Sequence, residues 1–251
     1  MAKKIKGIVR VGTSGLVVPG TISTFPEEFQ SGTRLQYYGT LFNTIEINSS
    51  FYKVPMGKTL EKWTTEVPDN FNFTLKLWRE ITHAKSLNFE EKNIEFFMNA
   101  ANRLGIKKGC LLIQFPGSIN FNYFNEVEKL LSLLSSYNTD KTWIYVVELR
   151  HNSWYQKLTY EMLNKNAASM VIQDIPKSKT PMDHPANKTI YLRFHGPSGN
   201  YRETYENEFL EDLSEKIKDW QKEGKNVYAY FNNTMGNAYE NAQYLKMLCT
   251  K

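Results

Sequence analysis

The chain has 251 residues, of which 41% are hydrophobic and 23% charged, and its formal net charge is +5. This composition is typical of a soluble globular protein, and a chain of this size is often a single domain. No apolar run approaches the roughly 18 residues of a membrane span, and the apolar stretch after the N-terminus is too short for a signal peptide. We therefore expect one cytoplasmic domain over residues 1–251 with no membrane association. The mild positive charge permits a partner that carries phosphate but does not require one.

Eight short apolar runs recur along the chain, and a charged or amide residue stands at or just past the end of nearly every one. The runs are Ile8–Gly12, Thr44–Ser50, Asn72–Leu77, Cys110–Phe115, Trp143–Leu149, Ser169–Asp174, Thr189–Phe194 and Asn226–Phe231. In a strand whose polar residues occur only at the C-terminal end, the apolar part is buried in a core and the polar end presents reactive groups. Eight such strands alternating with helices are what a (β/α)8 TIM-type barrel requires.

Stretches with helical spacing of apolar residues lie between these runs. They are Pro26–Phe42, Lys58–Glu66, Phe89–Leu104, Asn122–Leu134, Trp154–Asn166, Glu206–Lys222 and Asn237–Leu248. The sixth connection, from Asp174 to Thr189, contains Pro176, Pro181 and Pro185. Proline interrupts helices, so we expect a loop there with no helix longer than about two turns. The predicted fold is an α/β barrel of one domain whose sixth helix is replaced by a proline-rich loop.

Side chains alternate along a strand, so the polar residue at each strand end indicates which positions face the barrel axis. In the second run, Ile45 and Ile47 should face the helices, and Glu46 and Asn48 the axis. The same alternation gives the inward sets Thr74 with Lys76, Leu112 with Gln114, Val146 with Glu148, Ile172 with Asp174, Tyr191 with Arg193 and His195, and Tyr228 with Tyr230 and Asn232. Since barrel active sites lie at the C-terminal strand ends, we expect one cavity to hold the candidate catalytic residues Glu46, Lys76, Glu148, Asp174, Arg193 and His195. The structural alternative is that these charges only neutralise one another.

Further residues near the strand ends are candidates for substrate binding. The loops 195–202 and 232–238 are rich in Gly and Asn and follow the seventh and eighth strands, where barrels often hold phosphate. We predict an oxyanion between them, with Asn237 capping the last helix, although these residues could equally form turns only. Aromatic residues near the mouth, Phe51 among them, could stack on a sugar or base. The predicted set is Thr13, Ser14, Asn48, Tyr52, Gln114, Arg150, Trp154, Tyr201, Arg202, Tyr205, Asn232, Asn233 and Asn237.

Several motifs at the strand ends occur in the order found in a known family. They are VGTSG at Val11–Gly15, EINSSFY at Glu46–Tyr52, ITH at Ile81–His83, QFP at Gln114–Pro116, E-x-R-H-x-S-W at Glu148–Trp154, Y-x-R-x-H-G at Tyr191–Gly196, YAYFNN at Tyr228–Asn233 and GNAYENA at Gly236–Ala242. On these motifs the chain resembles the domain-of-unknown-function 72 family, also called YecE-like, over essentially its full length. The resemblance implies a TIM barrel and does not imply a particular reaction. The family usually continues GTSG with Trp and an aromatic loop, whereas Leu16 and residues 17–20 (VVPG) stand here, which predicts a different specificity if those aromatics line the mouth.

Two carboxylates on different strands can act as acid and base when their surroundings separate their pKa values. We therefore predict that Glu46 and Glu148 form such a pair and that Lys76 and Arg193 hold the charge of the substrate. No cofactor is identified. The carboxylates could hold a hard divalent cation, but no H-x-x-H or H-E-x-x-H spacing is present.

The sequence thus favours a hydrolase- or lyase-like enzyme that acts on a phosphate-bearing or sugar-like substrate. One alternative is a nucleic-acid-binding protein or nuclease that uses the same mouth. Another is a barrel that binds a metabolite without catalysis. A pure nucleic-acid binder would want an excess of Lys and Arg on a broad face, whereas the predicted mouth carries balanced charge.

Overall fold

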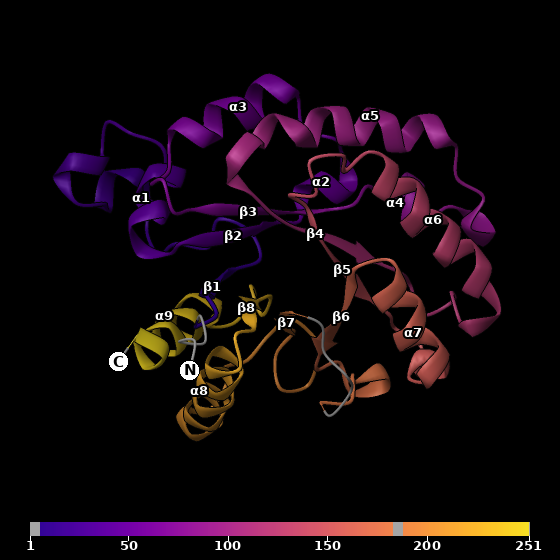
Figure 1. The fold of residues 1–251 in the computed structure, drawn as a ribbon. Helices are drawn as coiled ribbons and strands as arrows, with labels where there is room; N and C mark the ends of the chain where they lie inside the picture. The colour runs from indigo at the N-terminus through magenta and orange to yellow at the C-terminus, as the bar shows by residue number, and fades with distance from the viewer. Residues whose placement is uncertain (1–5, 183–187, 251) are drawn as a thin grey trace, which may run out of the picture.

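The computed structural model describes residues 6–182 and 188–250, and its centre is a sheet of eight parallel strands (Figure 1). The strands are β1 (Val9–Thr13), β2 (Thr44–Ile47), β3 (Asn72–Lys76), β4 (Lys108–Gln114), β5 (Ile144–Glu148), β6 (Ala168–Gln173), β7 (Thr189–Phe194) and β8 (Asn226–Phe231). From β2 to β8 each strand pairs with its neighbour in the chain, and β8 also pairs with β1. The predicted eight-stranded barrel is confirmed.

The barrel closes where β1 and β2 approach each other near the mouth. Ser14 forms an isolated parallel bridge with Glu46, and the Gly15 amide donates a hydrogen bond of 2.8 Å to the Glu46 carbonyl oxygen. Gly12 permits this approach, because a Cβ atom at that position would lie 2.3 Å from the Thr44 carbonyl oxygen. The glycine therefore helps to set the position of Glu46 relative to β1.

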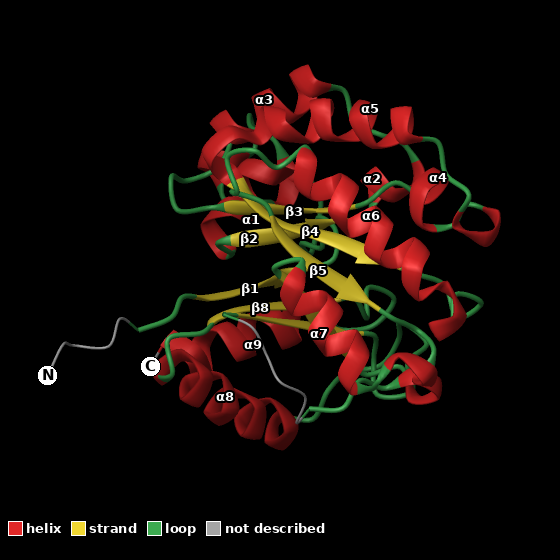
Figure 2. Cartoon of the chain, turned by 45° about the vertical axis from the view of Figure 1, so that its right-hand side comes forward, coloured by secondary structure: helices red, strands yellow, loops and turns green. Residues whose placement is uncertain are grey.

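Helices surround the strands (Figure 2). They are α1 (Arg34–Leu41), α2 (Ser49–Tyr52), α3 (Gly57–Thr65), α4 (Arg79–Thr82), α5 (Glu91–Ala101), α6 (Phe124–Ser136), α7 (Lys157–Lys165), α8 (Asn207–Lys222) and α9 (Ala238–Thr250). All seven predicted helical stretches contain a helix, with shifted boundaries. The short helices α2 and α4 were not predicted, and they follow β2 and β3 almost directly.

The largest boundary difference concerns α1, which was expected to begin at Pro26. Pro26 instead precedes a three-residue 3-10 helix, and the regular helix begins only after Thr33. The Gln36 amide donates to Thr33 Oγ1 over 3.2 Å, and the Thr33 amide donates to Gln36 Oε1 over 2.8 Å. This capping box satisfies two free N–H groups and fixes the start of the helix.

The sixth connection contains one short 3-10 helix, Pro176–Ser178, within the described residues 174–182. The proline-rich loop therefore takes the place of a regular sixth helix, as predicted. Residues 183–187, which include His184 and Pro185, lie outside the described part of the chain. None of the helices in residues 6–182 and 188–250 combines the length and hydrophobicity needed to span a bilayer.

The barrel interior has its own apolar cluster, separate from the larger core between strands and helices. Its members are Cys110, Leu112, Val146, Val171, Tyr191, Tyr228 and Tyr230. Prediction and structure agree on these positions except on β6, where Val171 faces the interior and Ile172 belongs to the outer core. A shift of one residue exchanges the two faces of a strand. Gln173, which pairs with Arg193 in register, therefore shares the inward parity, and Asp174 lies just past the strand end.

Candidate functional site

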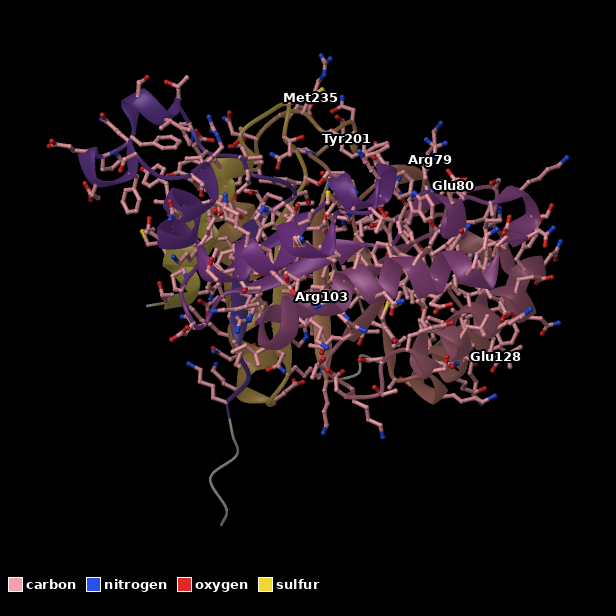
Figure 3. All side chains as sticks on the ribbon, turned by 90° about the horizontal axis from the view of Figure 1, so that it is seen from above. Arg79, Glu80, Arg103, Glu128, Tyr201 and Met235 are labelled. Carbon is pink, nitrogen blue, oxygen red and sulfur yellow. The ribbon has the colours of Figure 1, made fainter. Side chains whose placement is uncertain are left out.

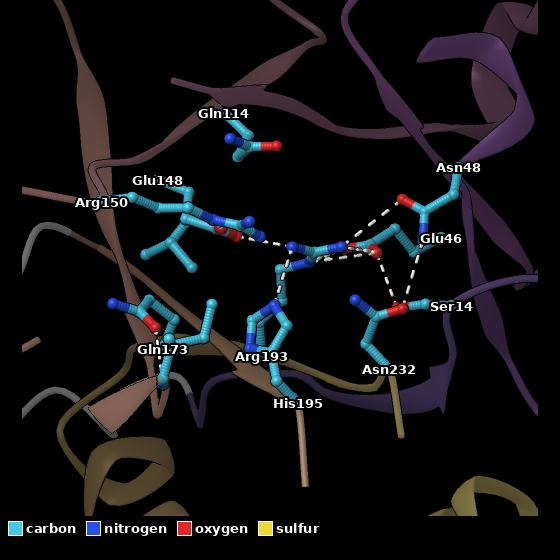
Figure 4. Close-up of polar contacts among 12 residues, drawn as sticks. Ser14, Glu46, Asn48, Gln114, Glu148, Arg150, Gln173, Arg193, His195 and Asn232 are labelled. Carbon is cyan, nitrogen blue, oxygen red and sulfur yellow. Dashed lines mark hydrogen bonds and ion pairs between the residues drawn. The ribbon is translucent and has the colours of Figure 1, made fainter. Parts of the chain in front are cut away.

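The guanidinium of Arg193 lies at the centre of the polar groups at the barrel mouth (Figure 4). Its Nε donates to both oxygens of Glu46 over 3.1 and 2.9 Å, and its Nη2 donates to Glu46 Oε1 over 2.9 Å. Its Nη1 donates to Glu148 Oε2 over 2.6 Å. One arginine on β7 therefore bridges carboxylates from β2 and β5.

Both carboxylates have further partners, and both are fully buried. Glu46 accepts hydrogen bonds from Ser14 Oγ at 2.6 Å and from the Tyr191 hydroxyl at 2.5 Å. Glu148 accepts a bond of 2.6 Å from Arg150 Nε. Two carboxylates thus face two guanidiniums, which is the neutral pairing that buried charges require.

The charges of these arginines determine the protonation of both carboxyls. Burial alone would raise the pKa of Glu46, but the charge and hydrogen bonds of Arg193 outweigh burial and lower it. Burial likewise acts against the charged form of Glu148, and Arg193 and Arg150 lower its pKa well below the usual range. Both groups are therefore ionised near neutral pH. The shared direction of the two shifts does not support the expectation that the pKa values of Glu46 and Glu148 separate into those of an acid and a base.

A second chain of hydrogen bonds supports Arg193 from the side of β6. His195 Nε2 lies 3.2 Å from Arg193 Nη1, and His195 Nδ1 lies 3.2 Å from Asp174 Oδ1. A guanidinium can only donate, so Nε2 must accept and Nδ1 carries the proton toward Asp174. Burial lowers the pKa of His195, which is consistent with this neutral form. Asp174 also accepts hydrogen bonds from the His195 amide and from the Tyr205 hydroxyl.

A cavity of about 520 Å³ opens above Arg193. Its lining residues are Asn48, Phe51, Tyr52, Lys76, Arg79, His83, Gln114, Arg150, Arg193, Tyr201, Asn232, Thr234 and Met235. Figure 3 shows Met235, Tyr201 and Arg79 toward the same side of the molecule, with Arg103 apart from them. Within residues 6–182 and 188–250, the lining includes four cationic side chains and no Asp or Glu. The predicted balance of charge therefore holds for the whole site, but the surface that faces the cavity is cationic.

Lys76, the last residue of β3, has an unusual environment in this cavity. Its Nζ lies 4.1 Å from the centre of the Phe51 ring, and no carboxylate of the described residues forms an ion pair with it. Burial lowers the pKa of Lys76 to about 7, and the charge of Arg193 acts in the same direction. A large fraction of this amine is therefore neutral at physiological pH.

The six predicted catalytic residues are brought close to one another, but they do not line one cavity. Lys76 and Arg193 line it, whereas Glu46 and Glu148 are not among its lining residues and pair with Arg193. Asp174 reaches Arg193 only through His195. The six residues thus form a cationic surface with supporting groups behind it.

The predicted substrate-binding residues divide into two groups. Those that line the cavity are Asn48, Tyr52, Gln114, Arg150, Tyr201 and Asn232. Those that do not are Thr13, Ser14, Trp154, Arg202, Tyr205, Asn233 and Asn237. Trp154 differs most from expectation, because it is completely buried and its Nε1 donates to the Ile119 carbonyl over 2.8 Å. Thr13 Oγ1 donates to the Gly15 carbonyl over 2.7 Å, which is a structural role at the end of β1.

The loops after β7 and β8 bond to each other, and this does not support the predicted oxyanion site between them. The amide of Met235 donates to the Tyr201 carbonyl over 3.0 Å, and the amide of Asn237 donates to the Glu203 carbonyl over 3.2 Å. The Asn233 side chain donates to the same Glu203 carbonyl over 3.0 Å. These N–H groups therefore hold the neighbouring loop.

Sequence reasoning missed four lining residues: Arg79, His83, Thr234 and Met235. Arg79 lies on α4, which is too short to produce a periodic pattern, whereas Phe51 on α2 was among the expected aromatic residues of the mouth. His83 follows α4 directly, and its ring lies 4.8 Å from that of Phe51. The motifs EINSSFY and ITH were the available signal, because both contain residues that line the cavity.

Leu16, which stands where the family usually has Trp, lies outside the cavity at the mouth. It instead lines a separate groove beside α1 and α3. This position therefore gives no support to an altered specificity at the mouth.

The arrangement of possible metal ligands does not favour metal binding. Across residues 6–182 and 188–250, no group of three or more His, Cys, Asp or Glu is arranged to hold a metal ion. The guanidinium of Arg193 also occupies the place of a cation between Glu46 and Glu148. A divalent cation on these carboxylates would have to displace it.

These features define the class of the protein as a nearly closed (β/α)8 barrel with a polar site at the C-terminal strand ends. Residues 10–251 match the family described as "Protein of unknown function DUF72", and the chain belongs to this family. The recognition of that family from the sequence is confirmed.

Relatives and solved structures agree with this assignment. The UPF0759 protein YunF of Bacillus subtilis is 27% identical over 245 residues, which cover 85% of each chain. A DUF72 protein from Thermotoga maritima superposes with a TM-score of 0.76 at 26% identity, covering 97% of this chain and all 100% of that one. A D-psicose 3-epimerase from Clostridium cellulolyticum reaches a TM-score of 0.53 at 11% identity over 86% and 90% of the two chains, which is a likeness of fold alone.

Proposed function

We propose that this protein is a hydrolase- or lyase-type enzyme that binds a small, oxyanion-bearing substrate in the cavity at the mouth of the barrel. The main support is the sign of the charges that face the cavity. Lys76, Arg79, Arg150 and Arg193 line it, and no lining residue in the described part of the chain is acidic. Phosphate and carboxylate groups are the ordinary partners of such a surface.

Neutral polar groups around the same cavity suit a substrate that also carries hydroxyl groups. Asn48, Gln114, Asn232 and Thr234 line the cavity, and each side chain can both donate and accept hydrogen bonds. A sugar phosphate or sugar acid combines an oxyanion with several hydroxyls. We therefore propose a phosphate-bearing or sugar-like substrate. We also propose a cytoplasmic location.

We assign the acid–base role to Lys76 in place of the carboxylate pair. A general base is most effective when its pKa lies near the working pH, and the pKa of Lys76 is lowered to about 7 by burial. Glu46 and Glu148 then hold Arg193 in position, and Asp174 orients His195 behind it. In this scheme the charged contacts to the substrate come from Lys76 and the lining arginines, and the neutral polar side chains of the lining contact its hydroxyl groups.

Two alternatives use the same cavity. A non-catalytic metabolite-binding barrel would bind the same ligands, but replacement of Lys76 would then change affinity without abolishing any turnover. A nucleic-acid-binding protein or nuclease would bind an oligonucleotide far more tightly than a sugar phosphate, and its affinity would fall steeply with salt because many phosphates are contacted.

Calorimetry with a matched pair of variants tests the proposal. Arg79 is half exposed and pairs with Glu80 at 3.7 Å, whereas Arg103 is similarly exposed, pairs with Glu61 at 2.9 Å and lies outside the cavity (Figure 3). We expect D-ribose 5-phosphate to bind, Arg79→Gln to weaken binding by about tenfold, and Arg103→Gln to leave it unchanged. D-ribose should bind much more weakly. The proposal fails if neither inorganic phosphate nor the sugar phosphate binds at millimolar concentration, or if both variants behave alike.

A further inference from the structure

We propose that Lys76 is the nucleophile of this cavity and that it condenses with the carbonyl group of a small anionic aldehyde or ketone to form an imine. This inference rests on the proposed function, because it uses the same oxyanion site. It goes further by naming the reactive group of the substrate and the bond that forms, and it replaces the general-base role of Lys76 with a covalent one.

The geometry around Lys76 supports a nucleophilic role. The Lys76 amide donates to Ser50 Oγ over 3.0 Å, and Ser50 Oγ donates to the Lys76 carbonyl over 2.8 Å, so the backbone is held from the start of α2. The Nζ lies over the Phe51 ring and faces the cavity. Glu46 and Glu148, which could have paired with this amine, are engaged by Arg193 and Arg150. The described surroundings thus leave the lone pair of the neutral amine available.

The charge state of Lys76 agrees with this geometry. An ordinary lysine has a pKa of about 10.4, so only a very small fraction is neutral at pH 7. The pKa of Lys76 is lowered to about 7 by burial and by Arg193. At pH 7 it therefore holds on the order of a thousandfold more neutral amine than an ordinary lysine. Desolvation beside another cation is an established way to activate a lysine nucleophile.

The reaction is balanced without an oxidant or reductant. The Nζ lone pair attacks the carbonyl carbon, a C–N bond forms, and the carbonyl oxygen takes up a proton to give a carbinolamine. The proton gained by oxygen in this step is one that nitrogen loses. The C–O bond then breaks as that oxygen takes up one further proton and leaves as water, and nitrogen keeps its remaining hydrogen as the C=N bond forms, which gives the protonated imine with a net uptake of one proton. His83 also lines the cavity, and its pKa is lowered to about 4 by burial and by the charge of Lys76. His83 packs against the same Phe51 ring as Lys76 Nζ, and we assign to its neutral imidazole the acceptance of the proton that nitrogen releases.

The surrounding charges indicate which carbonyl compounds fit. A protonated imine is a cation, and it would form beside Arg79, Arg150 and Arg193. A neutral substrate would add this positive charge to an already cationic cavity, which is unfavourable. A phosphate or carboxylate on the substrate offsets the charge and binds the arginines at the same time. The protonated imine would then withdraw electrons from a neighbouring C–C or C–H bond, as the breaking of that bond requires.

Borohydride trapping tests the inference directly. The protein is incubated at pH 7 with cyanoborohydride and with one member of two matched pairs: glycolaldehyde phosphate or glycolaldehyde, and pyruvate or methyl pyruvate. Reduction converts an imine to a stable secondary amine, and peptide mass spectrometry locates it. Lys53 is the internal comparator, because it is exposed and lies outside the lining of the cavity. We expect Lys76 to be labelled at least about tenfold faster than Lys53 by an anionic probe.

The variants distinguish the possible outcomes. Lys76→Arg should lose the label at this position and keep phosphate binding, and Arg79→Gln should slow labelling by the anionic probe but not by its neutral partner. Faster labelling of Lys76 by glycolaldehyde phosphate than by glycolaldehyde would show that phosphate is recognised, and faster labelling by pyruvate than by methyl pyruvate would show that carboxylate is recognised. Labelling of Lys76 no faster than Lys53 with all four probes would overturn the inference. If inorganic phosphate still binds in that case, the proposed function stands and only the imine is excluded.

Discussion

The substitution Glu148→Gln tests whether the buried carboxylates act as supports for the arginines. Glu148 is fully buried and accepts bonds of 2.6 Å from both Arg193 and Arg150. Removing its charge leaves one buried guanidinium without a counter-charge, at a cost of about 3–5 kcal/mol. For a chain of this size each kcal/mol corresponds to about 2–4 °C, so we expect the melting temperature to fall by roughly 10 °C.

Glu61→Gln is the matched control, because it removes a carboxylate that pairs with Arg103 at 2.9 Å on the surface. Exposed pairs of this kind contribute about 1 kcal/mol or less. Thermal and urea unfolding at pH 7 would compare the two variants with the parent. A loss for Glu148→Gln that does not exceed the loss for Glu61→Gln would refute the supporting role.

The difference in stability between the parent and Glu148→Gln should depend on pH. Arg193 and Arg150 lower the pKa of Glu148 in the folded protein against the effect of burial. A carboxyl whose folded pKa is lowered stabilises the protein above its unfolded pKa of about 4.3, and that contribution is lost as the pH falls below this value. The difference in stability between the parent and Glu148→Gln should therefore narrow on acidification below about pH 4. A difference that widens with acid would contradict the assignment.

Three further substitutions address the amine, the barrel closure and the core. Lys76→Met removes an amine whose pKa the fold lowers to about 7. We therefore expect the free energy of unfolding at pH 7 to rise by about 1–3 kcal/mol, a range that is reduced to allow for the partial exposure of the side chain. Between pH 7 and 10 the unfolded parent binds more protons than the folded parent, so the free energy of unfolding of the parent rises with pH. The difference between Lys76→Met and the parent, measured by urea unfolding, should therefore shrink over this range. Gly12→Ala should cost about 2 kcal/mol or more, because its Cβ would lie 2.3 Å from the Thr44 carbonyl oxygen; unchanged thermal unfolding would contradict this contact. Trp154→Phe should cost about 1–3 kcal/mol through the lost bond to Ile119 and leave the affinity for D-ribose 5-phosphate unchanged in calorimetry.

The strands could be predicted because each buried run is short, apolar and followed by a polar residue. Alternation along those runs also identified the inward residues Leu112, Val146 and Tyr191. The rule failed on β6, where Asp174 was taken as the guide to the inward face although it lies beyond the strand. Alternation holds only inside a strand, so a charged residue past its end carries no information about parity.

The depth of each side chain could not be predicted from the sequence. Glu46 pairs in register with Thr74, two residues before Lys76, so the carboxylate lies about one layer below the amine. This offset depends on the stagger of neighbouring strands in the closed barrel, which a single strand does not reveal. The sequence therefore predicted the convergence of Glu46, Glu148 and Arg193, but it did not predict that, of the charged residues at the mouth, the cations line the cavity and the carboxylates do not.

The protonation of Lys76 is the most direct test of the account, because both the proposed chemistry and the imine depend on a neutral amine in a cationic cavity. Competitive acetylation over a range of pH, read at each lysine by mass spectrometry, would measure it in the unmodified protein. We predict half-maximal reactivity of Lys76 near pH 7, in line with a pKa lowered to about 7 by burial. Half-maximal reactivity near the ordinary value of about 10.4 would contradict the account.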